Sequence, residues 1–172
     1  MKRYSVFCPI QRGPLTALDQ AAIQLQRSRF TGEARGETIA RVREALLLHE
    51  AYRDCIEFHL FPAIEEYEPA LVALIRDARD RDLPLYKQVL HAVQLLENMG
   101  MQEDQKRAGM KLTRGFTRYM AAQITALSKQ EEVLSKPLWH YYSDEELQQL
   151  VCGILYKLPA CQEPPIMDLV SG

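Results

Sequence analysis

The chain has 172 residues, of which 47% are hydrophobic and 26% charged, with a formal net charge of −2. This length suits one domain, and the composition is typical of a globular protein rather than a disordered or fibrous one. The charge gives no sign of nucleic-acid binding, and no apolar run is long enough to cross a membrane. The four cysteines lack C-x-x-C spacing, which favours reduced thiols and a cytoplasmic location.

Helical periodicity runs through the first half of the chain. A first helix is expected within residues 13–30, with Pro14 in its first turn and an apolar face formed by Leu15, Leu18, Ala22 and Leu25. A second helix is expected over residues 36–62, ending at Pro62. Its inward stripe consists of Ile39, Val42, Leu46, His49, Tyr52, Ile56 and Leu60.

The second half of the chain has the same helical character. A third helix is expected over 70–98, with Pro84 kinking or dividing it. A fourth helix is expected over 103–135, stopped by the segment that contains Pro137. Ser143 and Glu146 form the pattern of a capping box, which opens a short fifth helix before Pro159.

These elements are joined by short links, and signals for β-strands are nearly absent. The sequence therefore predicts an all-α, up-down-up-down four-helix bundle. We expect it to occupy residues 1–158, with the fifth helix covering one end, and residues 159–172 to form a C-terminal tail.

Polar residues interrupt the apolar stripes at a few positions. In helical bundles, ligands and metals are held by polar side chains that point inward from facing helices. The inward candidates are His49, Tyr52, Arg79, Gln123 and Glu131. His49 is either a core histidine bonded to a neighbour or a ligand.

Glu131 is ambiguous in the same way. A buried carboxylate needs a cation or a proton, whereas a carboxylate at the edge of the stripe reaches water. Its neighbour Glu132 is expected at the surface. No phosphate-binding glycine loop and no G-x-S-x-G motif is present. The chain is therefore not identified as an enzyme.

Three stretches resemble the hemerythrin-like HHE cation-binding domain family. The opening 3–15 with 23–30 is similar to the family's first helix, and "FHLFPAIEEYEPALV" is similar to the end of its second. The most specific stretch is "EEVLSKPLWHYYSDEELQQLVCGILYKLP", which resembles the family's closing Glu pair, Pro-Leu-Trp, helix cap and final helix. The likeness covers most of residues 1–158.

The resemblance implies a four-helix bundle that holds two bridged iron atoms through histidines and carboxylates. Family members carry oxygen, sense oxygen or iron, or handle nitric oxide and peroxide. Carried over position by position, the ligand sites fall on Gln11, Tyr52, Ile56, Arg79, Leu127 and Glu131. Only Glu131 is a ligand of the expected type, so the resemblance implies a member without its di-iron centre.

We therefore expect a metal-free core with no cofactor. In this hypothesis an Arg79–Glu131 ion pair replaces the metal cluster, and Tyr52 and Gln11 form hydrogen bonds to it. The six former ligand positions form a pocket, with His49 and Gln123 as further candidates for its lining. The pocket is either functional or only a structural ion pair.

Three functions compete at this point. The first is a binding module for a small acid or carbonyl-bearing ligand, or for a protein partner. The second keeps non-haem iron, with His49, Tyr52, Glu57 and Glu131 as substitute ligands. The third is a cofactor-free enzyme in which Tyr52, Arg79 and Glu131 do acid/base work.

Overall fold

A computed structural model describes residues 2–158, and within this range the chain is entirely helical, without a β-strand. The helices are α1 (Phe7–Arg27), α2 (Gly32–Cys55), a π-helical turn (Ile56–Leu60), α3 (Phe61–Glu65), α4 (Pro69–Asn98), α5 (Gln102–Tyr141) and α6 (Asp144–Lys157). The prediction of an all-α fold is confirmed. The predicted tail, 159–172, lies outside the described residues.

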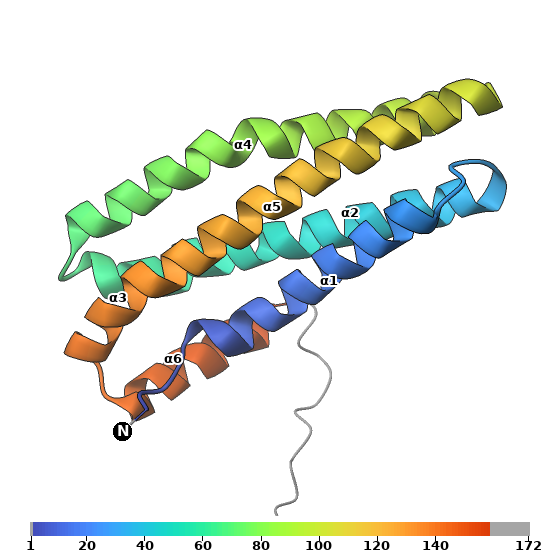
Figure 1. The fold of residues 1–172 in the computed structure, drawn as a ribbon. Coiled ribbons are helices and arrows are strands. Elements are labelled where there is room, and N and C mark those ends of the chain that lie inside the picture. The colour runs from blue at the N-terminus through green and yellow to red at the C-terminus, as the bar shows by residue number, and fades with distance from the viewer. Residues whose placement is uncertain (1, 159–172) are drawn as a thin grey trace, which may run out of the picture.

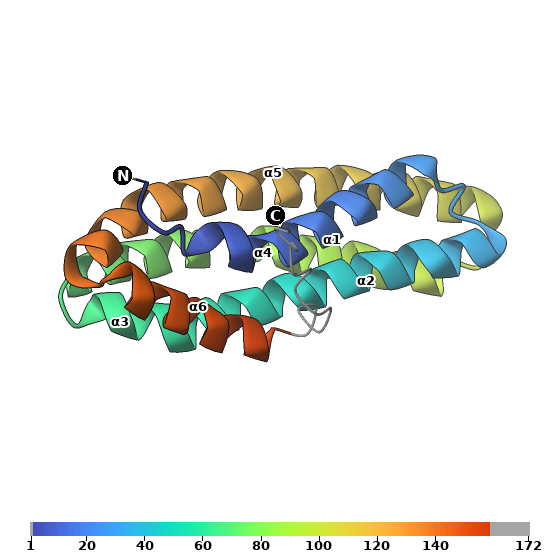
Figure 2. The same ribbon diagram turned by 90° about the horizontal axis from the view of Figure 1, so that it is seen from below.

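The four long helices lie alongside one another, and successive ones run in opposite directions (Figure 1). The helices pair as α1 with α2 and α4 with α5. Seen from below, α6 lies against α1 at the end of the molecule that also holds α3 (Figure 2). This arrangement is compatible with the expected four-helix bundle and its fifth helix.

Prolines proved poor guides to the helix ends. Helix α1 begins at Phe7, so Pro9 lies in the first turn and Pro14 inside the helix. The prediction that Pro137 stops the fourth helix is wrong, because α5 runs through it to Tyr141 and so buries Leu138. Pro84 does not divide α4; it is exposed, so water can satisfy the carbonyl that it leaves unpaired.

Features other than proline set the C-terminal end of α2 and the N-terminal end of α6. The second helix was expected to continue to Pro62, but α2 ends at Cys55 and widens into the π-helical turn, where the amide of Phe61 bonds the carbonyl of Ile56. The capping box is confirmed: the Ser143 hydroxyl accepts from the Glu146 amide, and the Glu146 carboxylate accepts from the Ser143 amide. No helix within residues 2–158 combines the length and apolar character needed to span a membrane.

The core consists of two apolar clusters. The α6-end cluster gathers Phe7, Ile10, Phe61, Leu134, Leu147 and Ile154 with their neighbours, and includes Tyr52, Ile56 and Leu127. The loop-end cluster gathers Leu18, Leu46, Val93, Leu112 and Phe116 with their neighbours, and includes Tyr119.

Between the clusters, each long helix contributes a polar side chain. On α1 it is Gln11, on α2 His49, on α4 Arg79 and Asp82, and on α5 Gln123. We call these five residues the polar layer. The layer divides the core at the place where the sequence predicted the pocket.

Candidate functional site

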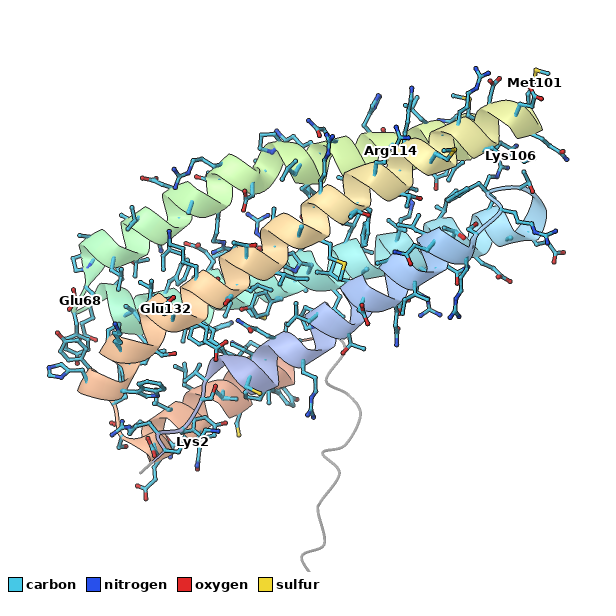
Figure 3. The ribbon with its side chains drawn as sticks, viewed as in Figure 1. Lys2, Glu68, Met101, Lys106, Arg114 and Glu132 are labelled. Carbon is cyan, nitrogen blue, oxygen red and sulfur yellow. The ribbon has the colours of Figure 1, made fainter. Side chains whose placement is uncertain are left out.

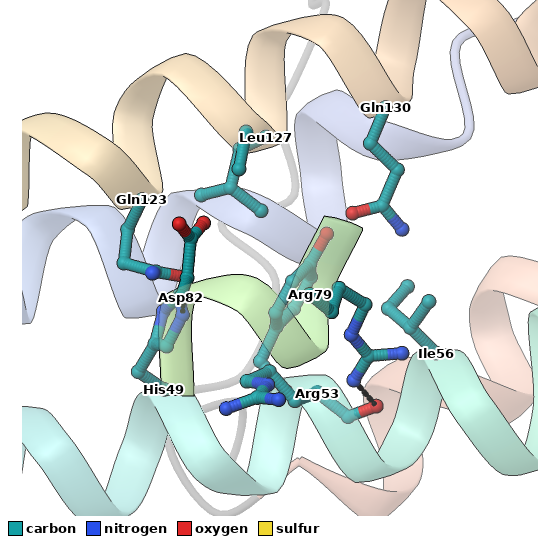
Figure 4. Close-up of a pocket in the computed structure, with 10 residues that line it drawn as sticks. His49, Arg53, Ile56, Arg79, Asp82, Gln123, Leu127 and Gln130 are labelled. Carbon is teal, nitrogen blue, oxygen red and sulfur yellow. Dashed lines mark hydrogen bonds between the residues drawn. The ribbon is translucent and has the colours of Figure 1, made fainter. Parts of the chain in front are cut away.

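A small cavity lies against the polar layer, between α2, α4 and α5 (Figure 4). Its volume is about 20 Å³, which is room for about one water molecule. It is lined by His49, Tyr52, Arg53, Ile56, Arg79, Asp82, Gln123, Ala126, Leu127 and Gln130. Of the pocket residues predicted from the sequence, six line this cavity, whereas Gln11 and Glu131 do not.

His49 anchors the loop-end side of the cavity. Only 1% of its surface is exposed, and its Nε2 lies 2.9 Å from Oε1 of Gln123. Because a carbonyl oxygen accepts, Nε2 carries the ring hydrogen and Nδ1 presents a lone pair. Burial lowers the pKa of His49 to about 4, although the bond to Gln123 opposes this shift. The ring is therefore neutral at neutral pH, and its Nδ1 has no hydrogen-bond partner among residues 2–158.

Tyr52 occupies the α6-end side and is 1% exposed. Its hydroxyl accepts a hydrogen bond from Nε2 of Gln11 at 3.5 Å, which is long for a hydrogen bond. Burial raises the pKa of Tyr52, and the charge of Glu131 adds to that effect. The phenol therefore stays protonated at neutral pH and is not available as a base.

The expected ion pair between Arg79 and Glu131 is not what the structure contains. Arg79 Nη1 lies 3.1 Å from a carboxylate oxygen of Glu57, and Nη2 donates to the carbonyl of Arg53 at 2.9 Å. Its guanidinium also lies 5.2 Å from the ring centroid of Phe61. Arg79 thus belongs to the junction of α2 and the π-helical turn, where Glu57 follows Ile56 by one residue.

Glu131 is only partly buried, and the neighbouring Gln130 is the deeply buried residue of that turn, 7% exposed. The amide nitrogen of Gln130 has no hydrogen-bond partner in the part of the chain that the structure describes. Gln130 was not expected to point inward, because a helical stripe can advance by three or four residues and the expected stripe advanced by four, from Leu127 to Glu131. The expectation that Glu132 is exposed is confirmed.

Arg53 and Asp82 also line the cavity and were missed. Neither side chain forms an ion pair or hydrogen bond with any residue of the described range 2–158. Both are partly exposed, at the mouth of the cavity. Arg53 directly follows Tyr52, so it lies beside the apolar stripe rather than on it, and helical periodicity assigns it to the surface.

These residues do not fit an iron centre. Iron in a non-haem site needs several histidine and carboxylate donors that converge. No group of three His, Cys, Asp or Glu side chains suited to a metal lies together within the described part of the chain. Glu57, one of the substitute ligands considered, pairs instead with Arg76 and Arg79. Ile56 and Leu127 place apolar carbon at two of the positions where the family resemblance implied ligands.

A second, larger hollow lies on the surface. It has a volume of about 550 Å³ and is lined by Glu68, Leu71, Glu132, Val133, Lys136, Pro137, His140 and Tyr141. Figure 3 shows Glu68 at the start of α4 and Glu132 on the last third of α5, at the same end of the molecule. The rings of Tyr67 and Tyr141 stack there, with centroids 4.1 Å apart. We call this hollow the α4–α5 groove.

Comparison of the chain with protein-family models, with curated proteins and with solved structures found no match.

Proposed function

We propose that the protein is a metal-free, hemerythrin-like four-helix bundle of the cytoplasm that binds a small polar molecule at the polar layer. One observation carries this proposal. Nδ1 of His49 and Nε2 of Gln130 are deeply buried, have no partner among the described residues, and belong to side chains that line the same cavity.

The energetics of burial support an occupant. Each buried polar atom without a hydrogen bond costs about 1–3 kcal/mol, so two such atoms on side chains that line one cavity are expensive to leave unsatisfied. An occupant with polar atoms would supply a hydrogen-bond partner in this cavity. Two features support an occupant other than a metal. Most positions where the resemblance implied iron ligands carry other residue types, and the positive charges of Arg53 and Arg79 at the mouth oppose a divalent cation.

Metal content and ligand-dependent stability test the proposal together. We expect purified native protein to contain much less than one iron atom per chain. In a thermal-unfolding screen against small polar molecules, at least one should raise Tm, because a ligand that binds only the folded state stabilises it. Stoichiometric iron, or a screen without any stabilising compound, would overturn the proposal.

Two variants of α5 supply the control. Ala126→Ile places carbon in the cavity, since Ala126 lines it. Ala121→Ile adds the same side chain on an exposed position of the same helix. The ligand-dependent rise in Tm should be lost in the first variant and kept in the second.

The α4–α5 groove supports a second candidate function, interaction with a protein partner. Tyr67 and Tyr141 are 43% and 37% exposed, and stacked aromatic rings beside an open groove are typical of contact surfaces. Sedimentation over a range of concentrations tests the simplest partner, a second copy of the chain. Concentration-dependent association that Tyr67→Ser weakens would support this function, and a monomer at all concentrations would exclude the second copy as the partner.

A further inference from the structure

The outer face of α5 carries a row of cations. Residues 105–130 contain no Asp or Glu, although the whole chain has a net charge of −2. Within this segment four cations recur at intervals of four, three and four residues, which places them on one face of the helix. All four are exposed and lie opposite the buried residues Leu112 and Phe116. This basic ridge consists of Arg107, Lys111, Arg114 and Arg118.

The charges of the basic ridge are not neutralised within the protein. None of its four residues forms an ion pair with any residue of the range 2–158. The ridge is about 16 Å long, at a rise of roughly 1.5 Å per residue. On the same helix face, Glu103 precedes it and Glu132 follows it, and these carboxylates repel a long polyanion such as a nucleic acid. The ridge therefore favours an acidic partner of limited length.

An acidic face with the same spacing is present on α2. It points away from the buried side of that helix. Glu33 and Glu37 have no ion pair among the described residues, whereas Glu44 pairs with Arg41 of its own helix at 3.3 Å. Intervals of four, three and four residues join the exposed members of this acidic ridge, which are Glu33, Glu37, Ala40 and Glu44.

A surface hollow of about 280 Å³ lies at the small residue of the acidic ridge. The series of intervals reads the same from either end, so the two ridges match with their helices parallel or antiparallel. Arg114 faces Ala40 in the parallel arrangement, and Lys111 does so in the antiparallel one. In either case a long cationic side chain can enter the hollow. The hollow is lined by Gln24, Glu37, Ala40, Arg41 and Glu44.

The two ridges cannot meet within one molecule. Helices α2 and α5 each pack on α1 and α4, so they lie diagonally across the bundle (Figure 2). Because each ridge faces away from the core, the two point in opposite directions. The basic ridge of one molecule therefore has its matching surface on another molecule of the same chain.

We propose that the protein associates with itself by docking the basic ridge of α5 on the acidic ridge of α2 of the next copy. The contact joins two different faces, so a dimer still has one free ridge of each kind, and association continues into chains. Exposed ion pairs are individually weak and are screened by salt, so the association is weak and strongest at low ionic strength. It does not require a ligand in the polar layer.

Sedimentation equilibrium over a range of concentrations gives the first test. At low ionic strength the average mass should rise with concentration beyond that of a dimer. At high ionic strength it should return to that of the monomer, because salt screens the ion pairs. A closed dimer held by apolar contacts would show neither behaviour.

A pair of complementary variants gives the sharper test. The α5 variant carries Lys111→Gln and Arg114→Gln, and the α2 variant carries Glu33→Gln and Glu37→Gln. All four positions are exposed, so the core is unchanged. Each variant alone should associate on the order of tenfold more weakly than the wild type. At a concentration where each is monomeric, an equimolar mixture should form dimers and nothing larger, because one intact ridge of each kind remains.

A matched control removes the same number of exposed cations from α4, outside both ridges. Arg81→Gln combined with Lys87→Gln should leave the association of the wild type unchanged. Weakening in this control equal to that in the α5 variant would mean that net charge, and not the basic ridge, governs the association.

The remaining outcomes are equally decisive. A monomer under all conditions, association that survives in both ridge variants, or a mixture without dimers overturns the inference. Association that depends on Tyr67 but not on the ridges belongs to the α4–α5 groove. A monomer whose basic ridge binds a single-stranded oligonucleotide or anionic lipid vesicles has a different partner, and the inference fails. Failure of the ligand screen affects only the proposed function, since no ridge residue lines the cavity.

Discussion

The apolar clusters and the polar layer are built from the same four helices but are satisfied in different ways. In the loop-end cluster, side chains such as Leu112 and Phe116 are fully buried and in contact with one another. In the polar layer, His49 has one hydrogen bond and one unpartnered nitrogen, and Arg53 beside it has no ion pair within the described chain. The difference teaches that the clusters hold the fold, whereas the polar layer contains polar atoms that the described chain does not satisfy.

The largest effect is expected from the loop-end cluster. Phe116→Ala removes a fully buried ring and should lower the free energy of unfolding by about 3–5 kcal/mol, because it loses both the buried surface and the packing around it. Chemical denaturation of the variant measures this loss. Thr117→Ala, at the next and exposed position, should change stability by less than about 0.5 kcal/mol. Equal losses in the two variants would contradict the assignment of the cluster as the stabilising core.

A pH titration of stability tests the burial of His49 in the polar layer. His49 has a pKa of about 4 in the folded protein, below its ordinary value of 6.5. Between these values the unfolded chain binds a proton that the folded chain does not, so stability falls as the pH falls from 6.5 to 4. The expected contribution of His49 is on the order of 3 kcal/mol.

The variant His49→Gln isolates this contribution from the titration of carboxylates elsewhere. It keeps a polar side chain opposite Gln123 but cannot be protonated. Between pH 6.5 and pH 4, its free energy of unfolding should decline less steeply than that of the wild type. Parallel curves would mean that His49 is protonated in the folded state and that the layer is more open to water than its burial indicates.

A close contact at the loop end gives a smaller, well-controlled effect. A Cβ atom at Gly109 would lie 2.1 Å from the Phe30 ring, and the backbone of Phe30 is already held at a φ of 57°. Gly109→Ala should therefore destabilise the protein by about 1–3 kcal/mol through overpacking. Gly115→Ala, on the same helix with open space around it, should instead raise stability by about 0.5–1 kcal/mol. Stabilisation by both substitutions would show that this end packs less tightly than the contact indicates.

Much of the fold could be predicted because it depends on periodicity. The stripe from Ile39 to Leu46 and the capping box at Ser143 are local patterns, and both appear in the structure. The start of α1 before Pro14 and the continuation of α5 past Pro137 could not be predicted in the same way. There, the burial of residues beyond the proline, such as Phe7 and Leu138, outweighs the local preference against continuing the helix.

The site was predictable only in its location. Substitution of the expected ligands placed a pocket between Tyr52, Arg79 and Leu127, and these side chains do line one cavity. The partner of Arg79 could not be predicted, because the π-helical turn brings Glu57 and the carbonyl of Arg53 within its reach. Periodicity assumes a regular α-helix and contains no signal for such a turn.

The smallest predicted effect tests the hydrogen bond that joins the polar layer, through Gln11, to Tyr52 of the α6-end cluster. Tyr52→Phe removes the bond from Gln11, which is long at 3.5 Å, and should cost no more than about 1 kcal/mol of stability. Tyr86→Phe, which removes a bond of 3.2 Å to Glu50 at the surface, serves as the control and should be close to neutral. A loss well above 2 kcal/mol in Tyr52→Phe would mean that the layer is a tightly coupled network, which is complete without a ligand. A small loss means that its internal bonds are weak, and this is the condition under which a bound group can organise it.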